Sequence, residues 1–204
     1  MKRRSLFAAA ALVSALVAPL MSQAQGTGKT LRVVPHSNIT ILDPIWTTAF
    51  VTRNHGYMIY DTLFGTDLAG KVKPQMVDKW NVSKDNLTWT FTLREGLEFH
   101  DGKPVTSEDV VASLKRWASR DSFDNYATPD AKTFVIKLKQ PFGVMLEALG
   151  KPSSNVPFIM PARIAATPGA EQIKEYVGSG PYKFVPAEYK PGERLVYVKN
   201  DKYK

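Results

Sequence analysis

The sequence predicts a mixed α/β protein that is exported from the cytoplasm, and three observations support this. The first 24 residues have the layout of a secretory leader. Thr88–Leu93 alternates hydroxyl and large apolar residues, a period that is typical of a strand with one wet face. The segment after Thr106 carries apolar residues at the spacing of an amphipathic helix.

Residues 1–24 are predicted to form a signal peptide. Basic residues from Lys2 to Arg4 precede an apolar stretch from Leu6 to Ala18, and Ser22-Gln23-Ala24 forms a small-x-small cleavage site. The apolar run is shorter than the roughly 20 residues that a bilayer core requires. We therefore expect cleavage near Ala24, with the Sec and twin-arginine export routes both open.

Composition narrows the class of protein further. The chain has no cysteine, so we expect neither a disulfide nor a thiol that could carry a lipid anchor. The formal net charge is +8, but the lysines are scattered among acidic residues and form no basic stripe with interleaved aromatics. We therefore expect no nucleic-acid partner.

The first half of the chain contains three predicted elements. Leu31–Val34 is predicted to be a short strand, followed by a turn at Asp43-Pro44, where proline disfavours helix in its predecessor. The spacing of apolar residues predicts a helix from Thr52 to Tyr60. Thr88–Leu93 is the strand described above.

A capped helix and a second strand follow the turn at residues 101–104. Thr106 stands three residues before Asp109, which predicts a helix start, and Lys115, Arg116 and Arg120 would complement the negative end of that helix. Thr133–Lys139 alternates again and is predicted to pair with the strand that contains Trp89.

The last third is predicted to be punctuated by prolines and glycines. Phe142–Leu149 is predicted to be a short helix, Lys151–Pro161 a loop too polar in its middle to be core, and Arg194–Lys199 a final strand. The run Gly178-Ser179-Gly180 lacks the spacing of a nucleophile elbow, and we interpret it as a tight turn that needs unusual φ angles.

Few residues suggest chemistry. His36, His55 and His100 lie far apart in sequence and show no metal-binding spacing. Asp101 is adjacent to His100, but neighbouring residues of an extended segment point in opposite directions, so we interpret this pair as a hairpin corner. We expect no catalytic residue, no metal site and no cofactor, and we predict that the protein is not an enzyme.

Several motifs in one order resemble the extracellular solute-binding proteins of family 5, the dipeptide, oligopeptide and nickel receptors of ABC importers. The resemblance covers the chain from about Leu31 to Tyr203. The motifs are Leu42-Asp43-Pro44, Tyr60-Asp61-Thr62-Leu63-Phe64, Lys73-Pro74-Gln75-Met76-Val77, Trp89-Thr90-Phe91-Thr92-Leu93-Arg94-Glu95-Gly96, Phe99-His100-Asp101-Gly102-Lys103-Pro104-Val105-Thr106-Ser107-Glu108-Asp109-Val110 and Gly178-Ser179-Gly180-Pro181-Tyr182.

The resemblance implies a periplasmic-binding-protein-like fold of type II, cluster C, in which two lobes close around a ligand. Residues 25–55 would form the N-terminal part of lobe I, residues 56–149 a subdomain inserted into lobe I, and residues 150–204 the return segment. Family members carry a second lobe beyond this point, so the chain is expected to be a fragment that lacks lobe II.

The resemblance also implies the ligand-binding segments. In peptide-binding relatives, the stretch that matches Thr47, Thr48, Ala49 and Phe50 offers its backbone to an extended peptide. The alternative for this stretch is a loop that packs Trp46 and Phe50 into the core. Small polar residues Ser153, Ser154 and Asn155 are a second candidate, and the alternative for them is a plain surface turn.

The function implied is the periplasmic substrate-binding component of an ABC importer, which captures di- or oligopeptides and delivers them to an inner-membrane permease. We expect a monomer. Two alternatives stay open: a receptor of the same family for a nickel chelate or another small solute, and a secreted α/β hydrolase.

Overall fold

The computed structural model describes residues 29–118 and 125–204. Pro35–Lys204 forms one compact unit, and Met1–Val34 is assigned to a separate one. The predicted signal peptide and the predicted end of a helix near Arg120 lie outside the described residues. Within those residues, no helix combines the length and the apolar character needed to cross a membrane.

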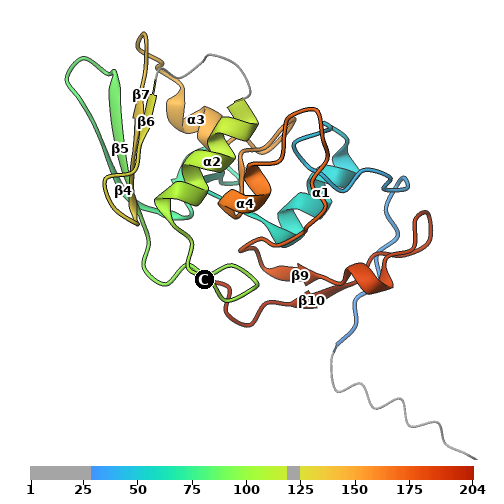
Figure 1. Cartoon of the computed structure of the whole chain (residues 1–204). Helices are drawn as coiled ribbons and strands as arrows, with labels where there is room; N and C mark the ends of the chain where they lie inside the picture. Colours follow the sequence, from blue (N-terminus) through green and yellow to red (C-terminus); the bar gives the residue numbers. More distant parts are fainter. Residues whose placement is uncertain (1–28, 119–124) are drawn as a thin grey trace, which may run out of the picture. The chain divides into compact units, whose positions relative to one another are not determined.

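The elements alternate short strands with a few helices (Figure 1). In chain order they are α1 (Phe50–Ile59), β1 (Asp61–Thr62), β2 (Phe64–Thr66), β3 (Val72–Pro74), β4 (Val77–Val82), β5 (Thr88–Leu93), α2 (Ser107–Ala118), β6 (Asn125–Ala127), β7 (Thr133–Lys137), α3 (Met145–Leu149), β8 (Phe158–Ile159), α4 (Ala162–Ala165), β9 (Tyr182–Phe184), a 3₁₀ turn (Pro186–Glu188) and β10 (Tyr197–Lys199).

The largest sheet has four antiparallel strands in the order β4-β5-β7-β6. The predicted strand at Thr88–Leu93 and its pairing with the later strand are both confirmed, with Phe91 opposite Phe134 and Trp89 opposite Ile136. Phe91 and Phe134 are fully buried and their rings stack at 4.9 Å between centroids. The alternation therefore places the large apolar residues on the face that packs into the core.

Helix α2 begins at the predicted cap. The amide of Thr106 donates to Oδ2 of Asp109 at 2.8 Å, and the amide of Asp109 donates to Oγ1 of Thr106 at 3.4 Å, which forms a reciprocal capping box. Oδ1 of Asp109 also accepts a hydrogen bond from the amide of Ala162 at 2.7 Å. Figure 1 shows α2 between the four-stranded sheet and α4.

Two hydrophobic clusters form the interior of Pro35–Lys204. The sheet cluster is built mainly from residues between Leu63 and Leu149, whereas the α1 cluster combines residues from both ends of the unit. The largest fully buried members of the sheet cluster are Leu63, Phe64, Met76, Phe91, Leu114, Phe134, Ile136, Met145 and Leu149. The α1 cluster includes Ile39, Leu42, Ile59, Tyr60, Val156, Phe158, Met160, Ile164 and Phe184.

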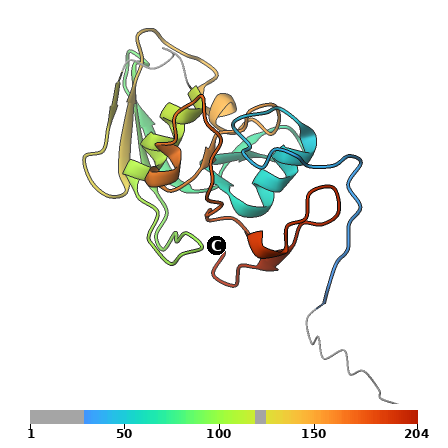
Figure 2. The same cartoon turned by 45° about the vertical axis from the view of Figure 1, so that its right-hand side comes forward.

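Segments distant in sequence meet around the α1 cluster. Strand β1, which precedes most of the sheet cluster in the chain, pairs with β8, which follows it (Figure 2). Strands β9 and β10 pair with each other. Helix α1 contacts β9. The helix predicted at Thr52–Tyr60 is thus confirmed, beginning two residues earlier at Phe50.

Three local predictions were wrong. Leu31–Val34 forms no strand, because a strand needs a partner and the described part of its unit offers none. Lys151–Pro161 is a surface loop only in its first half, where Ser153 and Ser154 are exposed; in its second half Val156 and Met160 are buried and the chain forms β8. Helix α3 begins at Met145 rather than Phe142, which is exposed.

Candidate functional site

The segment from Thr47 to Phe50 lies on the surface and leads into α1. Thr48, Ala49 and Phe50 are exposed, and Trp46 is 41% and Phe50 59% accessible. The interpretation in which Trp46 and Phe50 pack into the core is therefore wrong. The backbone groups of Thr48 take part in no hydrogen bond with the described residues, so both its N–H and its C=O are open to a partner strand.

This segment is held from below by a turn at Asp43. Oδ1 of Asp43 accepts a hydrogen bond from the amide of Ile45 at 3.0 Å, and its backbone carbonyl accepts one from the amide of Trp46 at 3.2 Å. Oγ1 of Thr47 accepts a further bond from the amide of Ala49 at 3.2 Å. These bonds fix the direction in which the chain enters α1.

The second predicted segment, Ser153–Asn155, contacts the turn that precedes the first. Nδ2 of Asn155 donates to the carbonyl of Ile45 at 2.7 Å, and the carbonyl of Asn155 accepts a bond from Nε1 of Trp117 at 2.7 Å. Ser153 and Ser154 are exposed, and Ser154 has a left-handed φ of 61°. The fold therefore ties the second predicted segment to Ile45, two residues before the first segment begins, and Asn155 makes this link.

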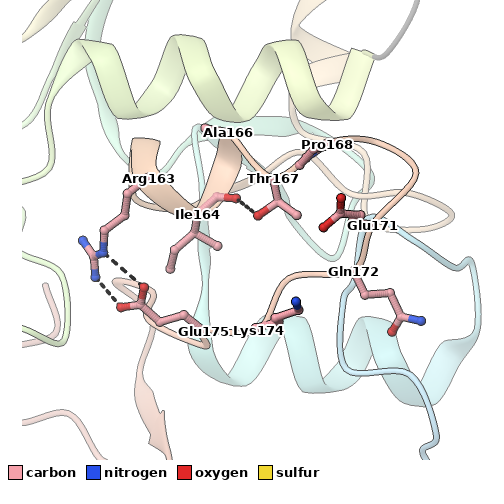
Figure 3. Close-up of a pocket in the computed structure, with 9 residues that line it drawn as sticks. All are labelled: Arg163, Ile164, Ala166, Thr167, Pro168, Glu171, Gln172, Lys174 and Glu175. Atoms are coloured by element: carbon pink, nitrogen blue, oxygen red, sulfur yellow. Dashed lines mark hydrogen bonds and ion pairs between the residues drawn. The ribbon is translucent and has the colours of Figure 1, made fainter.

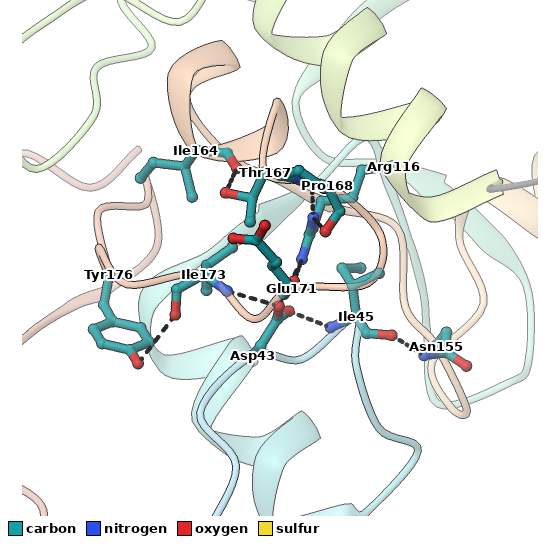
Figure 4. A network of polar contacts seen from close by, with 10 residues as sticks. All are labelled: Asp43, Ile45, Arg116, Asn155, Ile164, Thr167, Pro168, Glu171, Ile173 and Tyr176. Carbon is teal, nitrogen blue, oxygen red and sulfur yellow. Dashed lines mark hydrogen bonds and ion pairs between the residues drawn. The ribbon is translucent and has the colours of Figure 1, made fainter.

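A buried ion pair lies under the same turn (Figure 4). Nη2 of Arg116 and Oδ2 of Asp43 are 2.7 Å apart, and their side chains are 3% and 0% exposed. Oδ2 of Asp43 also accepts a hydrogen bond from the amide of Ile173 at 3.1 Å. Arg116 donates in addition to the backbone carbonyls of Thr167, Pro168 and Glu171.

The sequence does not predict this pair. Its pattern predicts only that Arg116 complements the negative end of the helix, whereas the side chain is buried and its guanidinium donates hydrogen bonds to carbonyls of a different segment. Arg116 does not lie at the i, i+4, i+7 spacing of the apolar residues Val110, Leu114 and Trp117, and the available signal for Asp43 was only a carboxylate before a proline. Neither feature alone specifies the other as its partner.

His100 and Asp101 do not form part of a catalytic triad. The amide of Gly178 donates to Nδ1 of His100 at 3.4 Å, and Nε2 lies 3.0 Å from the carbonyl of Gly180, so both ring nitrogens are engaged by backbone groups. Burial is the main cause that lowers the pKa of His100. Asp101 instead pairs with Arg163 at 2.9 Å. The predicted corner is confirmed by the left-handed φ of 83° at Gly102.

The glycines at positions 178 and 180 are required for a reason other than the predicted unusual φ angles. Neither has a positive φ. A Cβ atom at Gly178 would lie 1.8 Å from the carbonyl oxygen of Ile59, and one at Gly180 would lie 2.7 Å from that of Tyr60. These positions need glycine because two backbone segments approach closely, which lets the Gly180 amide donate to the Ile59 carbonyl at 3.0 Å.

His55 is a packing residue. It is 2% exposed, its Nδ1 lies 2.6 Å from the hydroxyl of Tyr197, and its ring packs edge-on against Phe184. Burial lowers the pKa of His55 to about 4. The neutral imidazole therefore belongs to the α1 cluster and has no access to a ligand.

A separate hollow of about 310 Å³ lies near α4 (Figure 3). Arg163 on its wall is already paired: its Nε donates to Glu175 at 3.2 Å, and the same guanidinium donates to Asp101. None of the residues predicted to bind ligand lines it. The lining residues are Arg163, Ile164, Ala166, Thr167, Pro168, Glu171, Gln172, Lys174 and Glu175. Across residues 29–118 and 125–204, no group of three or more His, Asp or Glu side chains is placed to hold a metal ion.

Comparison with known proteins gives a consistent result. The family model for "Bacterial extracellular solute-binding proteins, family 5 Middle" matches residues 71–204. The "Probable peptide ABC transporter periplasmic-binding protein y4tO" of Sinorhizobium fredii is 41% identical over 98% of this chain, which spans 39% of that relative. "Glutathione-binding protein GsiB" of Shigella dysenteriae is 32% identical over 82% of this chain and 34% of its own length.

A solved structure extends the likeness to the fold. The periplasmic binding protein AgaA of A. tumefaciens R10, in complex with agropinic acid, superimposes with a TM-score of 0.69 at 30% identity. The match covers 80% of this chain and 34% of AgaA. The fold is thus that of the periplasmic binding proteins, of which this chain spans about a third in the AgaA comparison. The family model and the relatives together establish that the chain belongs to family 5 of the bacterial extracellular solute-binding proteins.

Proposed function

We propose that this chain supplies one lobe of a periplasmic receptor that captures short peptides and delivers them to an inner-membrane ABC permease. The observation that carries the proposal is the exposed segment Thr47–Phe50, whose free backbone groups at Thr48 suit the addition of an extended peptide as a strand. Recognition through backbone groups is compatible with many side chains, which suits a peptide receptor.

The assignment of Thr47, Thr48, Ala49, Phe50, Ser153, Ser154 and Asn155 to ligand binding is part of this proposal. Its support is the hydrogen bond between Asn155 and Ile45, which holds the second segment to the turn that leads into the first. Asn155 commits one amide hydrogen to that bond. The exposed side chains of Ser153 and Ser154 are the polar groups of this loop that lie open for a ligand.

The proposed domain organisation places a subdomain inserted into lobe I at residues 56–149. The separation of the interior into a sheet cluster and an α1 cluster supports it, because the sheet cluster draws mainly on this range. The α1 cluster still includes Ile59 and Tyr60, so the packing boundary favoured by burial lies between Tyr60 and Leu63.

Because the chain covers 39% of the y4tO protein, we propose that the ligand is enclosed only when a second lobe is present. Ligand pockets bury about 70–90% of a ligand's surface, and one exposed segment does not. We therefore expect the 204-residue chain alone to bind peptides hardly at all. Tight stoichiometric binding to this chain alone, measured by calorimetric titration, would contradict the proposal.

The decisive test uses the complete receptor and three probes: trialanine, trialanine N-methylated at its central amide, and glutathione. Backbone recognition predicts that N-methylation weakens binding, whereas Thr48→Ala, which removes only a side chain, leaves the affinity for trialanine unchanged. Thr48→Pro removes the amide donor and should weaken binding by about tenfold or more. Equal affinity for the methylated and unmethylated peptides would contradict the proposal.

Two alternatives remain distinguishable by experiment. A receptor for another small solute is favoured if none of the peptides binds but a molecule copurifies with the complete protein, which mass spectrometry identifies. A hydrolase is favoured by turnover in a screen of ester and peptide substrates. We propose no turnover, because His100 and Asp101 each have other partners.

We further propose export with cleavage near Ala24, a monomeric state and no lipid anchor. The absence of cysteine from the sequence supports the last of these, since no thiol is available for a lipid. Intact mass measurement of the exported protein tests the cleavage site and the anchor together, and size-exclusion chromatography with light scattering tests the monomer.

A further inference from the structure

We propose that the buried pair Asp43–Arg116 positions the Thr47–Phe50 segment, and that Asn155 transmits this placement to the neighbouring loop. The proposal rests on the proposed function, because it assigns a role in ligand affinity to residues beneath the proposed site. Neither charged side chain reaches the surface, so both act through the backbone of Ile45 and are positioning residues.

The first step is the anchoring of the carboxylate. Oδ2 of Asp43 is held by Nη2 of Arg116 at 2.7 Å and by the amide of Ile173 at 3.1 Å, which come from α2 and from a segment far along the chain. This leaves Oδ1 facing the amide of Ile45 at 3.0 Å. The direction of that amide, and of the chain that follows it, is thus set by two separate parts of the fold.

The second step is the anchoring of the guanidinium. Arg116 donates to the carbonyls of Thr167, Pro168 and Glu171 in addition to Asp43. Its planar fork is therefore engaged on several sides, and a single rotation cannot move it without breaking several bonds (Figure 4). Asp43 consequently has one defined partner position.

The third step is the link to the second loop. Ile45 donates through its amide to Asp43 and accepts through its carbonyl from Asn155 at 2.7 Å, so both backbone groups of this residue are fixed. Asn155 is in turn held by Nε1 of Trp117, the residue after Arg116 on α2. Both loops of the proposed site are therefore held, directly or through Asp43, by neighbouring residues of the same turn of α2.

A buried ion pair at this place is explained better by positioning of the backbone than by a gain in stability. A buried ion pair costs desolvation, and well-packed apolar residues of similar volume are often as stabilising or more so. An apolar pair would leave the Ile45 and Ile173 amides and three carbonyls without these partners. What the charged pair provides is a unique arrangement of these backbone groups.

The test combines three variants of the complete receptor with two measurements. Arg116→Met breaks the pair, and Asn155→Ala removes the side-chain bond to the Ile45 carbonyl at a half-buried position where the fold is expected to survive. Ser113→Ala is the matched control, since Ser113 is buried on the same helix but bonds Met160 instead of the Ile45 turn. Amide hydrogen exchange reports on Ile45 and Trp46, and calorimetric titration reports on trialanine.

We expect exchange at Ile45 and Trp46 to accelerate by about tenfold or more, relative to the core of β5, in Arg116→Met and Asn155→Ala. The affinity for trialanine should fall by a similar factor in both variants, whereas Ser113→Ala changes neither quantity. A purely structural role would lower global stability in Arg116→Met without a local change at Ile45.

Equal exchange at Ile45 in Asn155→Ala and Ser113→Ala would overturn the inference, and so would faster exchange with unchanged affinity for trialanine. Failure of the wild-type receptor to bind trialanine would instead contradict the proposed function. In that case local acceleration of exchange at Ile45 and Trp46 still supports the positioning role, and its absence still overturns it.

Discussion

Substitution of Gly178 by alanine should destabilise the protein severely, although it adds only one methyl group. The added Cβ would lie 1.8 Å from the carbonyl oxygen of Ile59 and 2.8 Å from the ring of Tyr60. Ordinary contacts of a Cβ atom begin at 3.4 Å, so the two backbone segments must separate by about 1.6 Å. A backbone carbonyl inside the fold cannot rotate away as a flexible side chain does.

The magnitude follows from what this separation breaks. The hydrogen bond from the Gly180 amide to the Ile59 carbonyl, at 3.0 Å, crosses the affected contact, and the bond from the His100 amide to the Gly178 carbonyl, at 2.8 Å, ends on the residue that must move. Overpacking costs about 1–3 kcal/mol, and each lost hydrogen bond about 1 kcal/mol, so we expect a loss of about 3–5 kcal/mol. That is a large part of the 5–15 kcal/mol that stabilises a typical domain.

Urea unfolding followed by tryptophan fluorescence measures this loss. The matched control is Gly65→Ala, because a Cβ there meets no atom within 4 Å and Gly65 has no positive φ. In a strand, alanine should be neutral or more stable than glycine by up to about 1 kcal/mol. If Gly178→Ala unfolds within about 1 kcal/mol of Gly65→Ala, the close approach does not hold in solution.

Four further substitutions test burial, charge and capping. The pKa of about 4 at His55 lies below its ordinary value, so folding disfavours protonation of the imidazole. The contribution of His55 to the free energy of unfolding is complete above pH 6.5 and falls by about 3 kcal/mol as the pH drops to about 4, and His55→Asn should flatten this part of the pH profile of urea unfolding. Burial raises the pKa of Asp61 to about 6, so its effect on stability has the opposite sign to that of His55: the protein becomes more stable as the pH falls from about 6 to 3.8. Asp61→Asn should increase the free energy of unfolding by about 1–2 kcal/mol at pH 7 and remove this pH dependence. Phe91→Ala removes a fully buried ring stacked on Phe134 and should cost about 3–5 kcal/mol; a loss below 1 kcal/mol would show that the sheet core is not packed as described. Thr106→Ala removes one half of the capping box and should cost about 1 kcal/mol, with helix content by circular dichroism as a second readout, and an unchanged midpoint would contradict the cap.

Much of the local structure could be predicted from the sequence. Thr88–Leu93 has the predicted bounds and pairs with the predicted strand, and α2 starts at the predicted Thr106–Asp109 cap. These predictions succeed because the side-chain period of a strand and the unsatisfied amides of a helix start are properties of neighbouring residues. The exposed position of Thr47–Phe50 likewise agrees with the segment that the family resemblance indicated, although its role in binding stays a prediction.

Tertiary structure decided the features that depend on distant partners. Leu31–Val34 has a strand-like sequence but no strand partner among the described residues of its unit, whereas Phe158–Ile159 becomes β8 because Asp61–Thr62 lies beside it. Glycine at position 178 reads as a turn residue in the sequence, yet its reason is the carbonyl of Ile59.

The same distinction explains the buried pair beneath the proposed site. Asp43 and Arg116 are far apart in sequence, and the sequence by itself determined only that one precedes a proline and that the other lies near the end of an amphipathic helix. Their pairing depends on packing that excludes water from both side chains, since a charge so enclosed requires an opposite charge and hydrogen-bond partners within reach. The sequence determined the strand at Thr88–Leu93, the start of α2 and the family, and the packing of distant segments determined which residues hold the two loops together.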